Sequence, residues 1–255
     1  MNTSKFDVTI DFFAIKDAVV IRADITEEIS TLYTADVYVR VDEQVDTESL
    51  LNTYATISVN IDDTHWRYFS GIIESARFEN IISTHDNTER SILYIKVVPT
   101  FSRTIYKKRY RSFQNQSTID IILTVLKENS IADVKLDLQN RDRDIRDFCV
   151  QYGESDFHFM SRLMEEEGLF YYFRHDDGKD ILYISDLSQA GPQIERELRI
   201  RKYTTSVTIT PDSVYNVAFS DSIGTQQINT YSYDYQKAEV ITGTYSQIQK
   251  TKQNL

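Results

Sequence analysis

Alternation of apolar and polar residues is the feature that most constrains how this chain folds. From Lys5 to about Val98, apolar side chains recur at every second position. The clearest runs are Val19, Ile21, Ala23 and Ile25, and Ala35, Val37, Val39 and Val41. A period of two places successive side chains on opposite faces of a strand, so these runs predict half-buried antiparallel β-strands.

Further strands with turn residues between them follow in the same region. The candidates are Ala55–Ile61, Arg67–Ile82 and Ser91–Val98, with turns at Asp62-Asp63 and His85-Asp86-Asn87. About seven strands without a credible helix predict a barrel or sandwich over residues 1–99. Gly71 interrupts the second candidate and indicates a bulge or barrel corner, in preference to a ligand approaching its backbone.

Residues 100–168 are predicted to form a helical insert. The segment opens with a basic cluster of Arg103, Lys107, Lys108, Arg109 and Arg111. This cluster is either a patch for an anionic partner or a charged connector. We favour the connector, because the chain carries a net charge of −11 and a short cluster gives little attraction for a polyanion.

Two capped helices are predicted within this insert. Ser117 caps the first, which ends near Asn129, and its apolar face comprises Ile119, Ile122, Leu123 and Leu126. Ser155 caps the second, and Gly168 is a natural left-handed stop. The apolar face of this second helix comprises Phe159, Met160, Leu163 and Met164.

Residues 169–255 return to strand-like patterns. Leu169–His175 and Ile181–Asp186 predict a hairpin whose turn contains Gly178, and further strands are expected within Tyr203–Phe219 and Ile228–Ile241. The predicted fold is therefore β-rich, with two tube-like antiparallel barrels and a helical insert. The second barrel is incomplete, so a partner or a missing segment is expected to cover its open edge.

Composition excludes several functions. The acidic charge argues against a nucleic-acid partner. Cys149 stands alone and cannot form an internal disulfide, and the longest apolar run, Leu169–Phe173, is too short to span a membrane. No spacing suited to a metal or cofactor occurs among the four histidines, which are His65, His85, His158 and His175.

Enzyme chemistry finds little support in the sequence. There is no Gly-x-Ser-x-Gly, and Cys149 lies in an apolar run where it is a small buried hydrophobe. His158 and Glu154 have a helical metal spacing but no third ligand. Glu165 and Glu167 point in different directions on a helix, which is unsuited to glycoside hydrolysis. We predict no catalytic, cofactor or metal residues.

One stretch is more specific than these patterns. The segment from Arg146 to Phe173 resembles the signature of VgrG-type spike proteins of the type VI secretion system, and is similar to late-control D and hub proteins of contractile phage tails. Phe69–Ile73 and Ser112–Ile122 resemble earlier parts of that family, whereas Gly153 departs from the larger residue common there. The motif residues are Gln151, Tyr152, Glu154, Ser155, Asp156, Phe157, Arg162, Leu163, Glu165, Glu167 and Gly168.

The charges of this motif favour a structural role. Arg162 lies beyond helical pairing distance of Asp156, so we expect it to reach another element. The acidic run Glu165–Glu167 opposes the helix dipole at a C-terminus, which suggests compensation by Arg146 or Arg174 unless the run is an exposed charged face.

The resemblance implies a structural hub and no enzyme. Hubs of this kind form homotrimers of two-barrel subunits that match a hexameric, Hcp-like tube protein. They also contact baseplate proteins, a downstream needle domain or separate spike chain, and effectors. Assembly in the cytoplasm at the bacterial envelope, followed by expulsion through sheath contraction, is implied too. Since the sequence stops at Leu255, we expect a fragment or a shortened member. A carbohydrate- or receptor-binding β module is the alternative.

Overall fold

The chain divides into two compact units. A computed structural model describes residues 8–12, 18–41, 45–62, 65–83, 89–139, 144–176, 178–187, 199–200, 213–214, 227–235 and 237–246. The first unit comprises Met1–Glu197 with Ser206–Asp212, and the second comprises Leu198–Thr205 with Ser213–Leu255.

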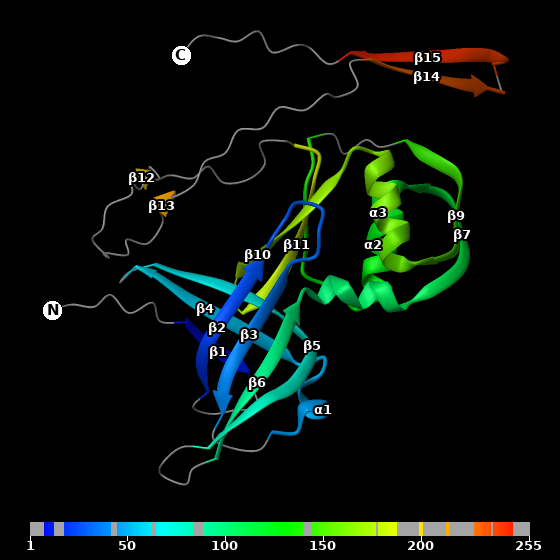
Figure 1. Cartoon of the computed structure of the whole chain (residues 1–255). Coiled ribbons are helices and arrows are strands. Elements are labelled where there is room, and N and C mark those ends of the chain that lie inside the picture. Colours follow the sequence, from blue (N-terminus) through cyan, green and yellow to red (C-terminus); the bar gives the residue numbers. More distant parts are fainter. Residues whose placement is uncertain are drawn as a thin grey trace. The chain divides into compact units, whose positions relative to one another are not determined.

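The first unit begins with a six-stranded antiparallel sheet in the order β1-β4-β5-β6-β3-β2. The edge strands β1 and β2 contact each other, so the sheet is nearly closed into a barrel (Figure 1). The strands are β1 (Val8–Phe12), β2 (Val19–Thr26), β3 (Thr34–Val41), β4 (Tyr54–Asp62), β5 (His65–Ser83) and β6 (Glu89–Val98).

The barrel core confirms the predicted alternation in β3. Its inward residues Ala35, Val37, Val39 and Val41 are buried and pack against Leu93, Ile95 and Val97 of β6. A short helix, α1 (Thr47–Leu50), was not predicted in this region; the Asp46 side chain caps it by accepting from the backbone N–H of Glu48. One turn of helix is too short to produce a helical period in the sequence.

Strand β2 corrects one prediction. The sequence placed Val19, Ile21, Ala23 and Ile25 on one face, but the register shifts between Val20 and Arg22. This bulge leaves Val19 and Ile21 exposed by 45% and 54%, while Val20 packs with Ala23 and Ile25 against the core. Because a bulge inserts one extra residue, every residue before it points to the opposite face of the sheet. The alternation of apolar residues in the sequence does not reveal where such a bulge occurs.

Gly71 marks a barrel corner, as predicted. Strand β5 pairs with β4 up to Ile72 and with β6 from Ile72 onward, and a bulge follows between Ile73 and Ser75. A Cβ atom at Gly71 would collide with the Val98 carbonyl and the Tyr33 hydroxyl. Glycine is therefore required here by the close approach of neighbouring groups.

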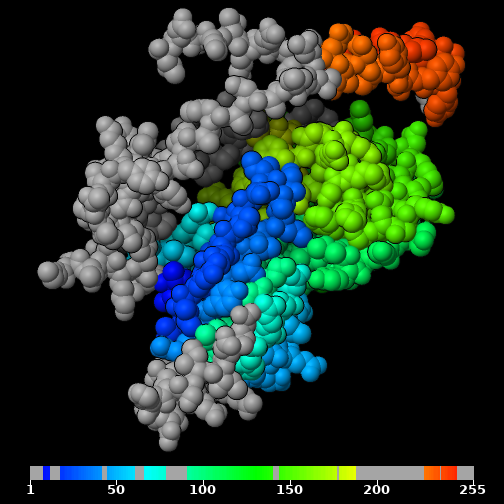
Figure 2. Space-filling model, viewed as in Figure 1, coloured from blue at the N-terminus to red at the C-terminus, as the bar shows by residue number. Residues whose placement is uncertain are grey.

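The insert packs two helices against a two-stranded ribbon (Figure 1). The 3-10 helix η1 (Thr100–Tyr106) leads into strand β7 (Lys108–Ser117), which pairs antiparallel with β9 (Ile145–Ser155). Helices α2 (Thr118–Glu128) and α3 (Asp156–Glu166) cover this ribbon. Figure 2 shows the insert in green beside barrel residues in blue and cyan.

Both predicted helices and their caps are confirmed. Ser117 Oγ accepts from the N–H of Asp120, and Ser155 Oγ accepts from the N–H of His158. The buried face of α2 differs in detail from the prediction, since Leu123 is only partly buried. The buried residues of this helix are Thr118, Ile119, Ile121, Ile122, Val125 and Leu126. The predicted connector after Arg103 is wrong from Lys108 on, because those residues form β7.

The predicted hairpin is present in a small mixed sheet. Strands β10 (Phe170–Asp176) and β11 (Lys179–Ser185) pair antiparallel, and β8 (Val134–Asp137) joins β11 in parallel. Gly178 has φ of +72°, which supplies the expected left-handed turn residue.

The second unit contains two strand pairs among the residues described. Strands β12 (Arg199–Ile200) and β13 (Ser213–Val214) pair in parallel, while β14 (Gln227–Asp234) and β15 (Glu239–Ser246) form an antiparallel hairpin. The strand-like region predicted over Ile228–Ile241 thus comprises parts of two strands with a turn between them. Apart from β13, the prediction for Tyr203–Phe219 lies outside the described residues.

Candidate functional site

Asp156, the first residue of α3, is fully buried at the centre of the motif. Its carboxylate accepts from Arg111 Nη2 at 3.2 Å, Gln151 Nε2 at 2.9 Å and Asn129 Nδ2 at 2.8 Å. Arg109 Nε lies 3.4 Å away. A buried carboxylate is tolerated only when it is paired and hydrogen-bonded, and Asp156 meets both conditions through β7, β9 and the end of α2.

Gln151 connects this carboxylate to the strands. Its side chain is fully buried, Oε1 accepts from Arg111 Nε at 2.7 Å, and Nε2 also donates to the Glu154 carbonyl at 3.0 Å. An amide that both donates and accepts fixes the relative positions of β7 and the end of β9. Gln151 and the capping Ser155 therefore hold the start of α3 in place.

Arg162 spans two elements. Its Nη2 donates to Glu154 Oε1 at 2.8 Å and to the Val150 carbonyl at 3.3 Å, both on β9. Its Nη1 donates to Glu166 Oε1 at 3.0 Å, one helical turn away. The expectation that Arg162 reaches another element is confirmed, but a local pair forms as well.

Arg146 compensates the acidic C-terminus of α3, as predicted. Nη1 donates to Glu166 Oε2 at 2.7 Å, Nη2 to Glu167 Oε1 at 3.1 Å and Nε to Thr118 Oγ1 at 2.8 Å. Although partial burial acts in the opposite direction, hydrogen bonds from Arg146 and Arg162 lower the pKa of the Glu166 carboxyl. One guanidinium thus joins β9 to the start of α2 and the end of α3.

The remaining motif residues serve packing and chain geometry. Leu163 is fully buried in the insert core, and Phe157 is partly buried against it. Gly168 has φ of +65°, so its place after α3 suits a residue without a side chain. Glu165 is exposed, and Tyr152 is 80% exposed on the outer face of β9.

Gly153 and its neighbours explain the departure from the family pattern. Gly153 has φ of +68°, and a Cβ atom there would lie 2.8 Å from Tyr110 Oη. The Tyr110 ring packs edge-on against Tyr152 at 5.2 Å. A larger residue would require this ring pair to move. Phe148 and Ile145 extend the exposed apolar surface along β9.

Asp180 was not singled out from the sequence, yet it joins the barrel to the insert. Its carboxylate accepts from Thr100 N at 2.7 Å, Thr100 Oγ1 at 2.8 Å and Tyr54 Oη at 2.8 Å. Burial raises the pKa of Asp180 and that of Tyr54. A carboxylate at the start of the apolar run of β11 was the only signal in the sequence.

His175, on β10, connects the small mixed sheet to the barrel. Its Nδ1 accepts from the N–H of Ser70 at 3.0 Å, and Nε2 lies 3.6 Å from Glu27 Oε1. Its ring packs against Tyr33 and Phe69. No group of three His, Cys, Asp or Glu side chains that could hold a metal occurs in the part of the chain that the structure describes.

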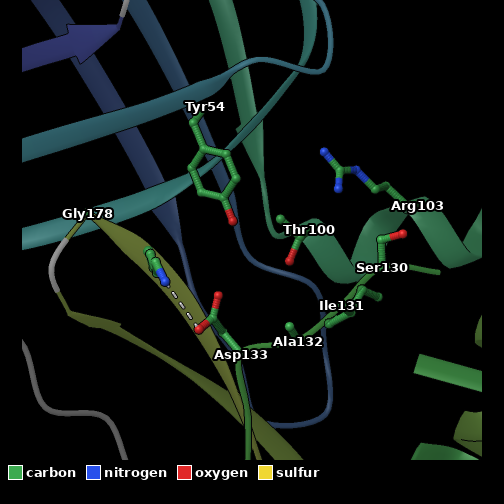
Figure 3. Close-up of a pocket in the computed structure, with 9 residues that line it drawn as sticks. Tyr54, Thr100, Arg103, Ser130, Ile131, Ala132, Asp133 and Gly178 are labelled. Carbon is green, nitrogen blue, oxygen red and sulfur yellow. Dashed lines mark ion pairs between the residues drawn. The ribbon is translucent and has the colours of Figure 1, made fainter. Parts of the chain in front are cut away.

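A groove follows the same junction. One cavity of about 460 Å³ lies between β4, η1 and the segment before β8, and a second of about 380 Å³ lies between α1, β5 and η1. Figure 3 shows Tyr54 extending from the barrel sheet toward Asp133, with Arg103 near Ser130. Arg103 lines both cavities. The other lining residues of the first cavity are Thr100, Ile131, Ala132, Gly178 and Lys179.

The residues weighed for catalysis have structural surroundings. Cys149 is buried in the insert core, and burial raises the pKa of its thiol, which disfavours the nucleophilic thiolate. Glu167 is hydrogen-bonded to Arg146 and Thr118, while Glu165 is exposed. Among the described helices, none combines the length and hydrophobicity needed to cross a membrane.

Comparisons with known proteins agree with the motif. Residues 26–254 match the phage tail baseplate hub (GPD) family. The type VI secretion system spike protein VgrG1b of Pseudomonas aeruginosa is 27% identical over 191 residues, which cover 74% of this chain and 25% of that protein. The actin cross-linking toxin VgrG1 of Vibrio cholerae is 30% identical over 163 residues, which cover 62% of this chain and 15% of that protein.

Solved structures share the fold. The Escherichia coli c3393 protein, described as a type VI secretion component similar to phage T4 tail proteins gp27 and gp5, aligns with a TM-score of 0.59 at 20% identity. The alignment covers 73% of this chain and 52% of that chain. A Neisseria meningitidis tail protein aligns with a TM-score of 0.54 at 12% identity, covering 96% and 68%.

The chain spans a quarter or less of the two curated relatives and about half of the c3393 chain. The family match, by contrast, covers most of this chain. On that ground, the chain belongs to the phage tail baseplate hub (GPD) family.

Proposed function

We propose that this chain is the hub portion of a VgrG-type spike in a contractile injection machine, and that its task is mechanical. The observation that carries the proposal is the family match over residues 26–254, together with relatives named as type VI spike proteins. The hub itself performs no bond chemistry, whereas a relative such as the actin cross-linking toxin VgrG1 has most of its length outside the matched region.

The internal contacts of the first unit suit a part that transmits force. The insert is tied together by Asp156 and Arg146, and Asp180 ties it to the barrel. Breaking the buried ion pair of Asp156 should cost about 3–5 kcal/mol, whereas the Arg146 pairs are partly exposed and Asp180 is held by neutral hydrogen bonds. Such contacts resist relative movement of elements under load. On this view the motif residues from Gln151 to Gly168 hold the insert rigid and touch no substrate.

The second unit supports assembly into a larger ring. Its hairpin exposes large apolar residues, which are Ile228, Tyr231, Tyr233, Tyr235, Val240, Ile241 and Tyr245. An isolated two-stranded hairpin is marginally stable in water, and apolar residues exposed in this number indicate an interface. We propose that residues 169–255 contribute to a second barrel beside the first barrel (1–99) and insert (100–168), completed by contacts within a homotrimer.

The wider partners follow from the same proposal. The homotrimer would join a hexameric, Hcp-like tube to baseplate proteins and to a needle that is either a downstream domain or a separate chain. Effectors would travel with it, and a neighbour of this fold was solved as a PdpA–VgrG complex from Francisella. Assembly would occur in the cytoplasm at the bacterial envelope, with expulsion on sheath contraction.

Mass in solution tests this proposal. Sedimentation equilibrium should give three times the 29.8 kDa chain mass. Tyr233 and Val240 face each other across the hairpin and are 62% and 63% exposed. Replacing both with Ser should shift the mass toward the monomer. Replacing Tyr110 and Tyr152, which are 73% and 80% exposed on the insert, should leave it unchanged.

The homotrimer proposal can be contradicted by the same measurements. A chain that stays monomeric at high concentration, with both hairpin edges protected from amide exchange, would contradict the trimer. If that monomer also bound carbohydrate, the chain would be better explained as a carbohydrate- or receptor-binding β module than as a hub.

A further inference from the structure

The groove between barrel and insert has an arginine at its centre. Arg103 lines both cavities, so its side chain borders each of them. It projects from η1, whose buried residues Phe101 and Thr104 fix that helix to the core. A charged side chain on a rigid element at the middle of a groove is placed to select what lies there.

The Arg103 guanidinium is held in one orientation. Its Nε donates to Asn52 Oδ1 at 2.9 Å, while the backbone N–H of Asn52 donates to the Ile73 carbonyl at 2.8 Å. Asn52 has φ of +61°, an unusual conformation for a residue other than glycine. Ser130, on the other wall, has φ of +58°. Both residues directly follow the C-cap of a helix, α1 or α2, where a left-handed residue commonly ends the helix.

The terminal nitrogens of Arg103 have no acid to bind within the described residues. Among the described residues the side-chain partner of Arg103 is the Asn52 amide and not a carboxylate, and its neighbour Lys107 is exposed. The nearby acids already have cations: Glu74 pairs with Lys96 at 2.6 Å, and Asp133 with Lys179 at 3.5 Å. The groove is thus locally positive in a chain whose net charge is −11.

Polar and apolar groups beside Arg103 fit a peptide. Asn129 lines the groove, and its buried Oδ1 accepts no hydrogen bond from the described residues. A peptide N–H can supply that missing donor. Leu51 and Tyr106, exposed by 44% and 69%, offer apolar surface alongside. An extended peptide can satisfy these features together, because it presents backbone N–H groups along its length and points successive side chains to opposite faces.

We propose that this groove binds an extended acidic segment of a partner protein. A carboxylate of the segment would pair with the Arg103 fork, which matches carboxylate geometry. A second carboxylate would lie near Lys107, and apolar side chains would cover Leu51 and Tyr106. The proposal goes beyond the hub function, since it needs neither the trimer nor the tube.

Fluorescence anisotropy with two labelled peptide pools tests the proposal on the full chain. In the first pool, short amidated peptides alternate Glu with Leu, Val, Phe or Tyr; in the second, Gln replaces every Glu. The acidic pool should bind at least about tenfold more tightly than its amide twin. Arg103→Gln should weaken that binding by at least about tenfold, whereas Lys108→Gln, the same charge loss on β7, should not.

Several outcomes would overturn the proposal. Equal binding of the two pools would show that the peptide carboxylates do not contribute to affinity. Unchanged binding by Arg103→Gln would show that the peptides bind elsewhere on the chain. Absence of binding to either pool counts against it too. A single-stranded oligonucleotide that binds more tightly than the acidic pool would point to a nucleic-acid surface instead. Circular dichroism at 222 nm should show that each variant remains folded.

Discussion

Replacing Asp156 with Ala should destabilise the insert far more than replacing an exposed acid that contacts the same arginines. Asp156 is fully buried, and Arg109 and Arg111 around it are 33% and 17% exposed. Removing one partner of a buried ion pair typically costs about 3–5 kcal/mol, because the remaining charges lose their compensation. Gln151 and Asn129 also lose an acceptor, which puts the expected loss at the upper end.

Glu128 supplies the matched control. Its carboxylate also pairs with Arg109 and Arg111, but it is 38% exposed. Exposed pairs contribute about 0–1 kcal/mol, so Glu128→Ala should have a small effect for the same change in charge. The difference between the stability losses of Asp156→Ala and Glu128→Ala therefore measures the effect of burial.

Urea unfolding followed at 222 nm is the appropriate assay. The two longest described helices, α2 and α3, both lie in the insert, so the helical signal reports on that part. The chain has two units, and only this transition is to be fitted as two-state. A loss below about 1 kcal/mol for Asp156→Ala, or equal losses for the two variants, would refute the assignment of Asp156 as the central tie of the motif.

Two further predictions concern the junction and the corner. Because burial raises the folded-state pKa of Asp180, the folded chain holds this proton more tightly than the unfolded chain does. In paired urea titrations, the free energy of unfolding of the native chain should therefore rise relative to that of Asp180→Asn as pH falls from 7 toward the ordinary Asp pKa near 4. A difference between the two chains that shrinks over this range would contradict this. Gly71→Ala should cost about 1–3 kcal/mol by collision with Val98 and Tyr33. Gly168→Ala, with open space but positive φ, should cost about 1 kcal/mol, and equal thermal shifts for the two would argue against the crowded corner.

The features predicted well from the sequence are those set by local chemistry. Alternation in β3, the serine caps of α2 and α3 and the glycine of the β10–β11 turn each act within a few residues. The compensation of the acidic end of α3 by Arg146 was also foreseen, because the helix dipole demands a cation there.

The features that were missed depend on the partner across space. The bulge at Ile21 changes which side of β2 is buried, and nothing in the alternation marks it. Strand β7 carries so many cations that it resembled a solvated connector, yet Arg109 and Arg111 face Asp156 and Glu128. Asp180 lies far along the chain from Tyr54 and Thr100, so only the folded arrangement shows its role.

The change of partner within β5 also bears on how the barrel folds. Because β4 and β6 each pair with a different part of the same strand, neither ladder is complete without it. A cut in the chain at Ile72 would leave the β4–β5 ladder in one fragment and the β5–β6 ladder in the other, while the β3–β6 ladder would have to form between the two fragments. The six strands should thus appear together as one cooperative step, and fragment complementation should require both pieces at once.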